Sequence, residues 1–312
     1  MNEHLTTPSV PALSGGHEGD NRPVTLKSGS RLMLQRTQGI GGLTVKQGHD
    51  GRSRLDRLYQ QAAARIRVPD HHGRTDLEAV LINTAGGVTG GDELSWDLVA
   101  GPDTRVTVTT QACEKVYKSD DGAATVDIKL TVAQGARLQW LPQETILFDR
   151  AHLHRTITAD LHDRSSLLLV EPIIFGRTAM GEALKQGTWV DRWRILHNGE
   201  LIHAENVRLM GDIAEHLDRV ASLPAMTALA TVALFGNHAE AKLEGARDLM
   251  GAAKNTVASV SCWQVGGQSK LIARVAATGG YDLRAALIPL INHLAHGATN
   301  QAAPAVPKIW SL

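Results

Sequence analysis

The sequence predicts a mainly β fold built of layered sheets, with a few α-helices near its C-terminal end. From Leu77 to Ile174, polar and apolar residues alternate with a period of two, which is typical of strands. Turns that contain glycine or aspartate separate the short alternating runs, and no long run of helical spacing stands between them. Regularly spaced short strands without intervening helices indicate an all-β layered structure.

The alternating segments follow one another in order along the chain. They lie at 105–110, 125–132, 137–141, 156–161, 166–170, 188–197, 201–209 and 226–235. Val, Thr, Ile and Leu fill their apolar positions, and β-branched residues favour strands. The low aromatic content of 4% therefore does not oppose this assignment.

Two stretches near the C-terminal end have helical spacing instead. Residues 238–250 place apolar side chains three and four positions apart, and Gly251 provides a stop. Residues 282–296 carry a stripe of Leu and Ile, with Asp282 as a candidate N-cap. Pro289 inside this stretch predicts a kink or a later start.

Residues 54–68 fit two patterns. One set of apolar residues has the spacing of a helix face: Leu55, Leu58, Ala62 and Ile66. The second half of the segment, at 64–68, alternates as a strand does. We expect a strand there, and periodicity leaves both structures open for the first half.

Composition limits the domain organisation and the function classes. Residues 1–23 are rich in Pro, Gly and small polar residues, which predicts a disordered tail, and residues 24–312 are expected to form a single domain. Lys plus Arg equals Asp plus Glu at 32 each, and a nucleic-acid binder would need a basic excess. The chain shows no signal peptide and no apolar run of about 20 residues, so we expect a cytoplasmic protein that engages no membrane.

Local features resemble catalytic or metal-binding signatures without completing them. The glycine-rich stretch 86–92 lacks the Gly-Lys-Ser/Thr of a phosphate-binding loop, and we interpret it as a turn between strands. Cys113 is a candidate nucleophile, although a small buried residue is its commoner role. Several close histidine pairs would each need a carboxylate to hold a divalent ion, and such pairs are more often surface or capping residues.

A series of motifs resembles the UreD family of urease accessory proteins, called UreH in some bacteria. The motifs stand in register at 81–92, 109–118, 141–148, 171–182, 271–274 and 306–310. They include Leu-Ile-Asn-Thr-Ala-Gly-Gly-Val-Thr-Gly-Gly-Asp, Thr-Thr-Gln-Ala and Leu-Pro-Gln-Glu. The resemblance covers about residue 24 to the end. The family's Trp-x-x-x-Arg-like element is absent here, where residues 290–295 read Leu-Ile-Asn-His-Leu-Ala.

The resemblance implies a mainly β fold of stacked sheets in a β-helix-like arrangement, flanked by a few C-terminal helices. It also implies a role without catalysis in the maturation of urease. Proteins of this family bind the urease apoprotein subunits and UreF, which recruits the GTPase UreG, and the assembly inserts nickel. The chain is then expected to be a scaffold and nickel chaperone with no tightly bound cofactor, through which Ni²⁺ passes transiently.

A passage for Ni²⁺ needs oxygen ligands that bind weakly enough to release the ion. The carboxylates inside the matched motifs are the candidates: Asp92, Glu144, Glu171 and Glu182. For Asp92 and Glu144, a turn cap or a surface ion pair is the more common role. Glu171 stands between apolar runs and is expected to be buried, and a buried charge requires a partner or a function.

Two alternatives to this reading are open. One is a β-rich hydrolase that uses Cys113 or a histidine–carboxylate pair, which predicts turnover by the isolated chain. The other is a structural subunit without an ion passage, in which the carboxylates only hold turns.

Overall fold

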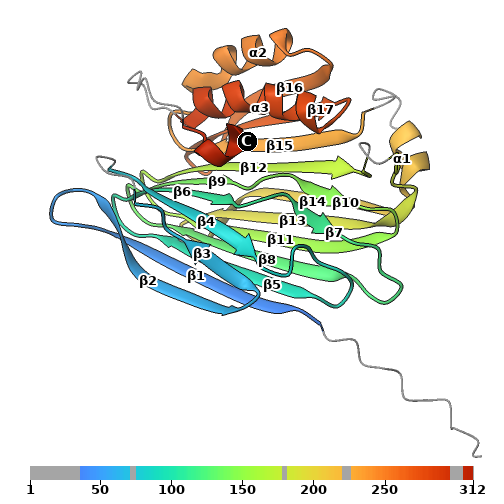
Figure 1. Cartoon of the computed structure of the whole chain (residues 1–312). Coiled ribbons are helices and arrows are strands. Elements are labelled where there is room, and N and C mark those ends of the chain that lie inside the picture. Colours follow the sequence, from blue (N-terminus) through green and yellow to red (C-terminus); the bar gives the residue numbers. More distant parts are fainter. Residues whose placement is uncertain (1–35, 71–74, 178–180, 220–225, 296–304, 312) are drawn as a thin grey trace, which may run out of the picture. The chain divides into compact units, whose positions relative to one another are not determined.

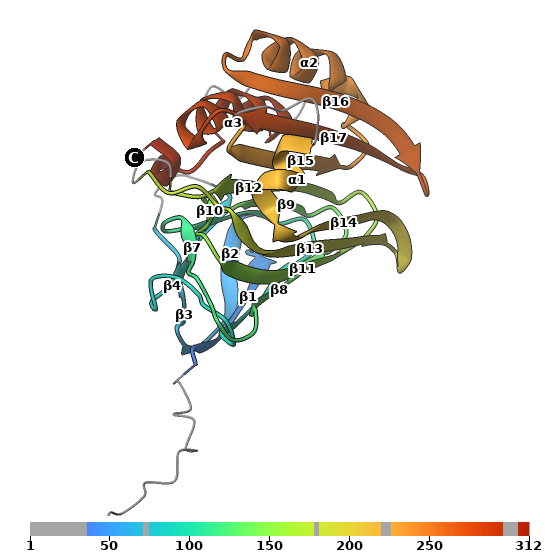
Figure 2. The same ribbon diagram turned by 90° about the vertical axis from the view of Figure 1, so that its right-hand side faces the viewer.

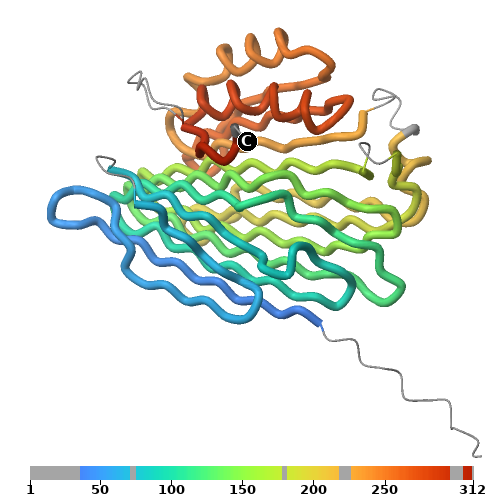
Figure 3. Tube along the Cα trace, in the orientation of Figure 1, coloured from blue at the N-terminus to red at the C-terminus, as the bar shows by residue number. Residues whose placement is uncertain are grey.

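Two β-sheets face each other, and the chain alternates between them (Figure 1). Four neighbouring parallel strands of the ten-stranded sheet are β4 (Leu77–Asn83), β6 (Arg105–Thr110), β9 (Arg137–Leu141) and β12 (Ser166–Phe175). Four neighbouring parallel strands of the seven-stranded sheet are β5 (Glu93–Ala100), β8 (Ala124–Val132), β11 (Ala151–Leu161) and β13 (Gln186–His197). Each crossover passes to the other sheet, so successive coils stack as in a β-solenoid (Figure 3). The predicted β-helix-like fold is confirmed.

The structure is a computed structural model that describes residues 36–70, 75–177, 181–219, 226–295 and 305–311. These residues belong to one compact unit that spans Arg36–Leu312. The tail predicted for residues 1–23 lies outside the described residues. In the described part of the chain, no helix is both long enough and apolar enough to cross a membrane.

Further strands extend both sheets beyond the coils. In the seven-stranded sheet, β1 (Gln38–Gln47) joins β5 to the antiparallel β2 (Ser53–Ala62), and β14 (Glu200–Asp212) pairs antiparallel with β13. In the ten-stranded sheet, β3 (Ala64–Arg67) pairs with β4, and β12 is followed by the antiparallel β15 (Ala228–Phe235), β17 (Gln268–Ala277) and β16 (Thr256–Val265). The short strands β7 (Glu114–Val116) and β10 (Thr145–Leu147) pair with each other, and β10 also pairs with β12.

Inward-facing side chains of successive coils lie in rows because the strands are in register. One row in the seven-stranded sheet is Leu98, Leu130, Ala159 and Ile195. The facing sheet contributes the row Ala79, Val108, Trp140 and Leu169. All of these residues are buried and belong to one hydrophobic cluster between the sheets. Burial of apolar surface there is the main stabilising term of the solenoid.

Helices cover the outer face of the ten-stranded sheet at its C-terminal strands, β12, β15, β17 and β16 (Figure 2). They are α2 (Leu243–Ala252), which follows the 3₁₀ turn η2 (Glu240–Lys242), and α3 (Gly280–Ala295). Their apolar sides form a second buried cluster with outward-facing residues of β12, β15 and β17. The remaining helical elements are α1 (Ile213–Arg219), after β14, and η3 (Lys308–Ser311).

The strand predictions are confirmed with small shifts of their ends, and the first half of residues 54–68 is also a strand. A β-bulge between β1 and β2 explains the helix-like spacing there. Leu58 is opposite Leu43 and Leu55 is opposite Val45, so apolar residues three apart on β2 share one face of the strand pair. Helical periodicity therefore arose from one extra residue in a strand.

Both predicted C-terminal helices are present. The second, α3, starts at Gly280, so Pro289 lies inside it and does not delay its start. Asp282 is the third residue of this helix and not its N-cap. Its carboxylate accepts hydrogen bonds from Thr278 Oγ1 at 2.7 Å and from Asn255 Nδ2 at 3.1 Å, which ties the helix start to the neighbouring loops.

Candidate functional site

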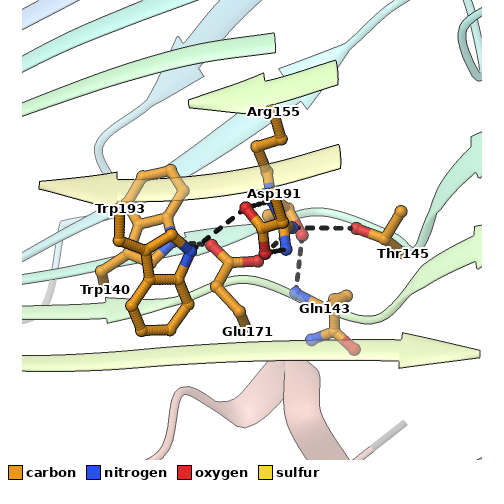
Figure 4. A network of polar contacts seen from close by, with 8 residues as sticks. Trp140, Gln143, Thr145, Arg155, Glu171, Asp191 and Trp193 are labelled. Carbon is orange, nitrogen blue, oxygen red and sulfur yellow. Dashed lines mark hydrogen bonds and ion pairs between the residues drawn. The ribbon is translucent and has the colours of Figure 1, made fainter. Parts of the chain in front are cut away.

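Glu171 points into the space between the two sheets and meets an arginine from the opposite sheet (Figure 4). It follows the inward-facing Leu167 and Leu169 on β12 at the same period of two, which places its side chain inside. Arg155 Nη1 donates a hydrogen bond to Glu171 Oε2, and Trp140 Nε1 donates to Oε1 at 2.6 Å. The side chains of Glu171 and Arg155 are only 3% and 5% exposed.

Asp191 completes this buried cluster from the neighbouring strand. Because Arg155 on β11 is the register partner of Asp191 on β13, the two side chains lie side by side. Arg155 Nε donates to Asp191 Oδ1 at 3.1 Å and Nη2 donates to Oδ2 at 2.6 Å, a bidentate pair. Trp193 Nε1 donates to Asp191 Oδ1 at 3.1 Å, and Arg155 Nη1 lies 3.5 Å from Thr145 Oγ1. We call Arg155, Glu171 and Asp191 the interior ion cluster.

One guanidinium faces two carboxylates in the interior ion cluster, so the cluster has a net negative charge when both acids are ionised. Burial raises the pKa of Glu171 to about 7, and the charge of Asp191 adds to this shift while Arg155 opposes it. Burial alone would lower the pKa of Arg155, but the two carboxylates raise it. Arg155 therefore keeps its charge, and burial favours the protonated form of Glu171.

Glu144 occupies a second cluster, where the C-terminal helix meets the solenoid. It lies between β9 and β10, and Arg284 on α3 pairs with it through Nε at 2.9 Å from Oε1 and through Nη2 at Oε2. Arg284 Nη2 also donates to Gln143 Oε1 at 2.6 Å. Cys113 Sγ donates to Glu144 Oε2 at 3.2 Å. These contacts fasten α3 to the coils.

Asp92 is buried at the end of the glycine-rich loop that connects β4 to β5. Its Oδ1 accepts a hydrogen bond from the Thr37 backbone N–H and its Oδ2 accepts one from the Thr89 backbone N–H, both at 2.8 Å. Both oxygens thus hold backbone groups, as in a turn cap. The loop itself lies between two strands, as predicted for the glycine-rich stretch.

Glu182 forms an ion pair with Arg177. The two residues are also joined by an isolated β-bridge, and the Glu182 side chain is 26% exposed. The four predicted carboxylates therefore have four separate sets of partners. Within the described residues, no group of three or more His, Cys, Asp or Glu side chains is placed to hold a metal ion.

Arg155, Asp191 and Arg284 are site residues that the sequence reasoning missed. Arg155 and Asp191 each stand at an inward position of an alternating strand, next to apolar residues at the same parity. Charged residues at inward parity are the signal that could have found them, because a charge on the core side of a strand needs a partner. Arg284 lies on α3, directly after Leu283 of the apolar stripe. Its position in the helix gave no comparable sign that it belongs to a site.

A cavity of about 380 Å³ reaches the interior ion cluster from the region between β14 and the strands β15, β17 and β16. Glu171 and Asp191 line its inner end, and Trp189, Val207 and Leu229 are among the apolar residues that line the rest. The two carboxylates are thus the inner wall of a mainly apolar cavity.

Cys113 does not have the properties of a nucleophile. Burial raises the pKa of its thiol to about 11, and the nearby carboxylate of Glu144 adds to the shift. A cysteine nucleophile reacts as the thiolate, so this thiol is in its unreactive form at neutral pH. The histidine–carboxylate pairs of the described residues, such as His197 and Asp163 at 3.7 Å, lie beyond hydrogen-bond distance.

Glu114 provides a test of these electrostatics by pH. Its Oε1 accepts a hydrogen bond from Asn83 Nδ2 at 3.0 Å, and burial raises its pKa to about 7. A carboxyl whose folded pKa is raised makes the protein less stable as pH rises from about 4.5 to about 7. We expect Glu114→Gln to be more stable than the wild type at pH 8, by up to about 3 kcal/mol, and equally stable at pH 4.5.

Urea unfolding of both proteins across this pH range measures the difference in unfolding free energy. Glu93→Gln, which alters an exposed carboxylate, is the control. A stabilisation by Glu114→Gln that is the same at every pH would contradict the assignment, since only a titrating carboxylate makes the difference depend on pH.

The fold and the site together define a class: a two-sheet β-solenoid with paired, buried charged side chains between its sheets. Comparison with known proteins gives the family. The model of the family described as "UreD urease accessory protein" matches residues 39–311, and the chain belongs to this family.

Relatives that carry the name urease accessory protein UreD match most of the chain. The protein from Agrobacterium fabrum is 46% identical over 278 residues, which cover 89% of this chain and 92% of that protein. The one from Sinorhizobium medicae is 43% identical over 287 residues, which cover 92% of this chain and 100% of that protein. The one from Mesorhizobium japonicum is 45% identical over 280 residues, covering 90% and 96% respectively.

Proposed function

We propose that this protein is a non-catalytic accessory factor in urease maturation, and that it acts as a scaffold and as a passage for Ni²⁺ in complex with the urease apoprotein, UreF and UreG. The accessory role in urease maturation rests on the family match over residues 39–311, together with 46% identity to a protein named urease accessory protein UreD. The raised pKa of Cys113 supports the non-catalytic assignment. We place its action in the cytoplasm, without a membrane or a nucleic acid as partner.

The interior ion cluster supports the passage. It puts carboxylate oxygens between the sheets, and a cavity reaches two of these acids. Oxygen ligands hold Ni²⁺ less firmly than thiolates, and a passage needs sites that release the ion. In the proposed transfer, an incoming Ni²⁺ competes with Arg155 for Glu171 and Asp191. Glu144 and Glu182, which pair with Arg284 and Arg177, are proposed as further transient contacts for the ion.

Asp92 is the weakest of the proposed contacts. Both of its oxygens already accept backbone hydrogen bonds, so a passing ion would have to share them. If Asp92 only holds the glycine-rich loop, its replacement by alanine lowers the yield of folded protein and leaves the nickel content of the urease that does form unchanged.

The test replaces the two glutamates Glu171 and Glu182 by leucine. We expect Glu171→Leu to fold, because Arg155 and Asp191 remain as a balanced bidentate pair after one carboxylate is removed. Glu171→Gln, which keeps an acceptor for Trp140 Nε1, is the matched control for folding. The measurement is nickel per urease active site after co-expression with the urease genes, beside a pull-down of UreF and the apoprotein.

We expect the double leucine variant to retain its partners and to lower the nickel content of urease at least tenfold. Full nickel loading would remove these residues from the passage. Loss of partner binding would instead assign them an interface role, and turnover by the isolated wild-type chain that Cys113→Ala abolishes would favour the hydrolase alternative.

A further inference from the structure

Strand β14, at the edge of the seven-stranded sheet, faces the strands β15, β17 and β16 of the other sheet (Figure 2), and residues of these four strands line a groove. It holds the cavity of about 380 Å³ described above and a more polar one of about 570 Å³. Glu205, Ser259 and Arg274 line both cavities, so the two are adjacent. We call the two cavities together the edge groove.

Lys270 is a buried cation in the edge groove. It is only 6% exposed, and its Nζ donates to the Ile202 backbone oxygen at 2.7 Å and lies 4.9 Å from the centre of the Trp263 ring. Among the described residues, no carboxylate lies within ion-pair distance of it. Lysine is almost never buried without a partner, because an unpaired buried charge is costly.

In the same place, His203 has a ring nitrogen without a hydrogen-bond partner among the described residues. This nitrogen is Nε2, and the side chain is 9% exposed. The nearest carboxylate oxygen, Glu205 Oε2, is 3.9 Å away, which is too far for a hydrogen bond. Burial and the charge of Lys270 lower the pKa of His203 to about 4, so the ring is neutral at pH 7 and can donate or accept one hydrogen bond at Nε2.

In the polar cavity, the charged side chains other than Lys270 cancel each other. Arg274 Nη2 pairs with Glu205 Oε2, and Arg274 Nη1 donates to Thr231 Oγ1 at 2.9 Å. Lys270 therefore leaves a net positive charge on the polar cavity. A carboxylate placed beside Lys270 would neutralise this charge, and it could accept a hydrogen bond from His203 Nε2.

The surroundings favour a polypeptide as the carrier of that carboxylate. Residues 201–205 of β14 line the polar cavity, and from Glu205 onward alternate residues, namely Glu205, Val207 and Leu209, line the groove while the residues between them are exposed. β14 and β16 are the end strands of their sheets, so each has an edge that can pair with an added strand. From Leu201 to Leu209 the groove follows about 26 Å of strand at roughly 3.3 Å per residue. A small anion would fill only the polar end.

We propose that the edge groove binds an extended segment of a protein partner that places an acidic side chain against Lys270 and apolar side chains along Val207 and Leu209. The exposed side chains of Trp263 and Val257, at 42% and 48%, form the rim that the partner covers. This inference rests on the proposed role as a scaffold in urease maturation, and it does not depend on nickel passing through the interior ion cluster.

The experiment compares Lys270→Met with Lys254→Met, which removes an exposed lysine in the turn before β16. Each full-length variant is tagged and co-expressed with the urease apoprotein and UreF. We expect Lys270→Met to retain at least tenfold less of one partner than the wild type or Lys254→Met does, and Lys270→Arg to retain wild-type amounts. The thermal midpoint of isolated Lys270→Met should equal or exceed that of the wild type, because a buried unpaired charge is removed.

Hydrogen exchange of the wild-type complex locates the contact. Amides of β14 and β16 should exchange more slowly in the complex than in the isolated chain. Three results would each overturn the inference. The first is unchanged partner retention by Lys270→Met, and the second is a lowered thermal midpoint of this variant. The third is protection of these strands in the isolated chain that grows with its concentration, as a second copy would cause. If Lys270→Met keeps its partners while the Glu171 and Glu182 variants lose nickel, the groove is rejected and the nickel passage is supported. If Lys270→Met loses a partner while the Glu171 and Glu182 variants keep nickel, the groove is supported and the passage is rejected.

Discussion

Replacing Arg155 by methionine is expected to lower the free energy of unfolding by about 3 to 5 kcal/mol. The substitution keeps most of the volume of the side chain and removes the cation that pairs with both Glu171 and Asp191 in the interior ion cluster. Two buried carboxylates then lie without a counter-charge, and at least one must take up a proton. Because Arg155 comes from one sheet and Glu171 from the other, the loss also removes a link between the sheets.

Arg192→Met is the matched control, since Arg192 is an exposed arginine beside Asp191 on β13, and we expect it to change stability by less than about 0.5 kcal/mol. The triple variant Arg155→Met/Glu171→Gln/Asp191→Asn has no charge in the cluster and keeps an acceptor for each tryptophan N–H. It should recover most of the lost stability. Urea unfolding of the purified chains measures all three, and a loss in Arg155→Met that the triple variant does not recover would mean that packing, not charge, holds the arginine.

The sequence was sufficient for most of the solenoid because each strand has one face toward the core. Alternation between polar and apolar residues on β8, for example, reports directly which side chains point inward. The hairpin of β16 and β17 was not predicted strand by strand. On β17 nearly every residue is buried on both faces, so its apolar residues do not alternate. Buried central strands lose the periodic signal for that physical reason.

The candidate site was predicted only in part because its chemistry depends on pairing across coils. The burial of Glu171 follows from the apolar residues on both sides of it, and the structure confirms that burial. Its partners are Arg155 and Trp140, which lie 16 and 31 positions away along the chain. Sequence spacing gives the face of a strand on which a residue lies, whereas the partner depends on how the coils stack. Lys270 of the edge groove was not predicted for the same reason. Its polar neighbours along the strand suggest an exposed surface, whereas the residue is buried.

The glycine-rich loop gives the second large effect, and Gly90→Ala is the change that tests it. A Cβ atom at this position would lie 2.4 Å from the Gly122 backbone oxygen, 2.5 Å from the Asp121 backbone oxygen and 2.0 Å from Ser119 Oγ. Two of these atoms belong to the backbone of the loop that precedes β8, so no side-chain rotation relieves the overlap. We expect a loss of roughly 3 kcal/mol or more, because overpacking against backbone forces whole segments apart.

Gly86→Ala is the control in the same loop. Gly86 has a φ of +76°, and a Cβ there would meet no atom within 4 Å, so its cost is only that of a left-handed backbone, about 1 to 2 kcal/mol. A glycine is thus required at position 90 because a Cβ atom has no room there, and at position 86 because the backbone is left-handed. Thermal unfolding and the yield of folded protein should rank the wild type above Gly86→Ala and Gly86→Ala above Gly90→Ala. If Gly90→Ala proved as stable as Gly86→Ala, the two loops could not be packed as closely as these distances require, and the glycine-rich stretch would serve as a turn only.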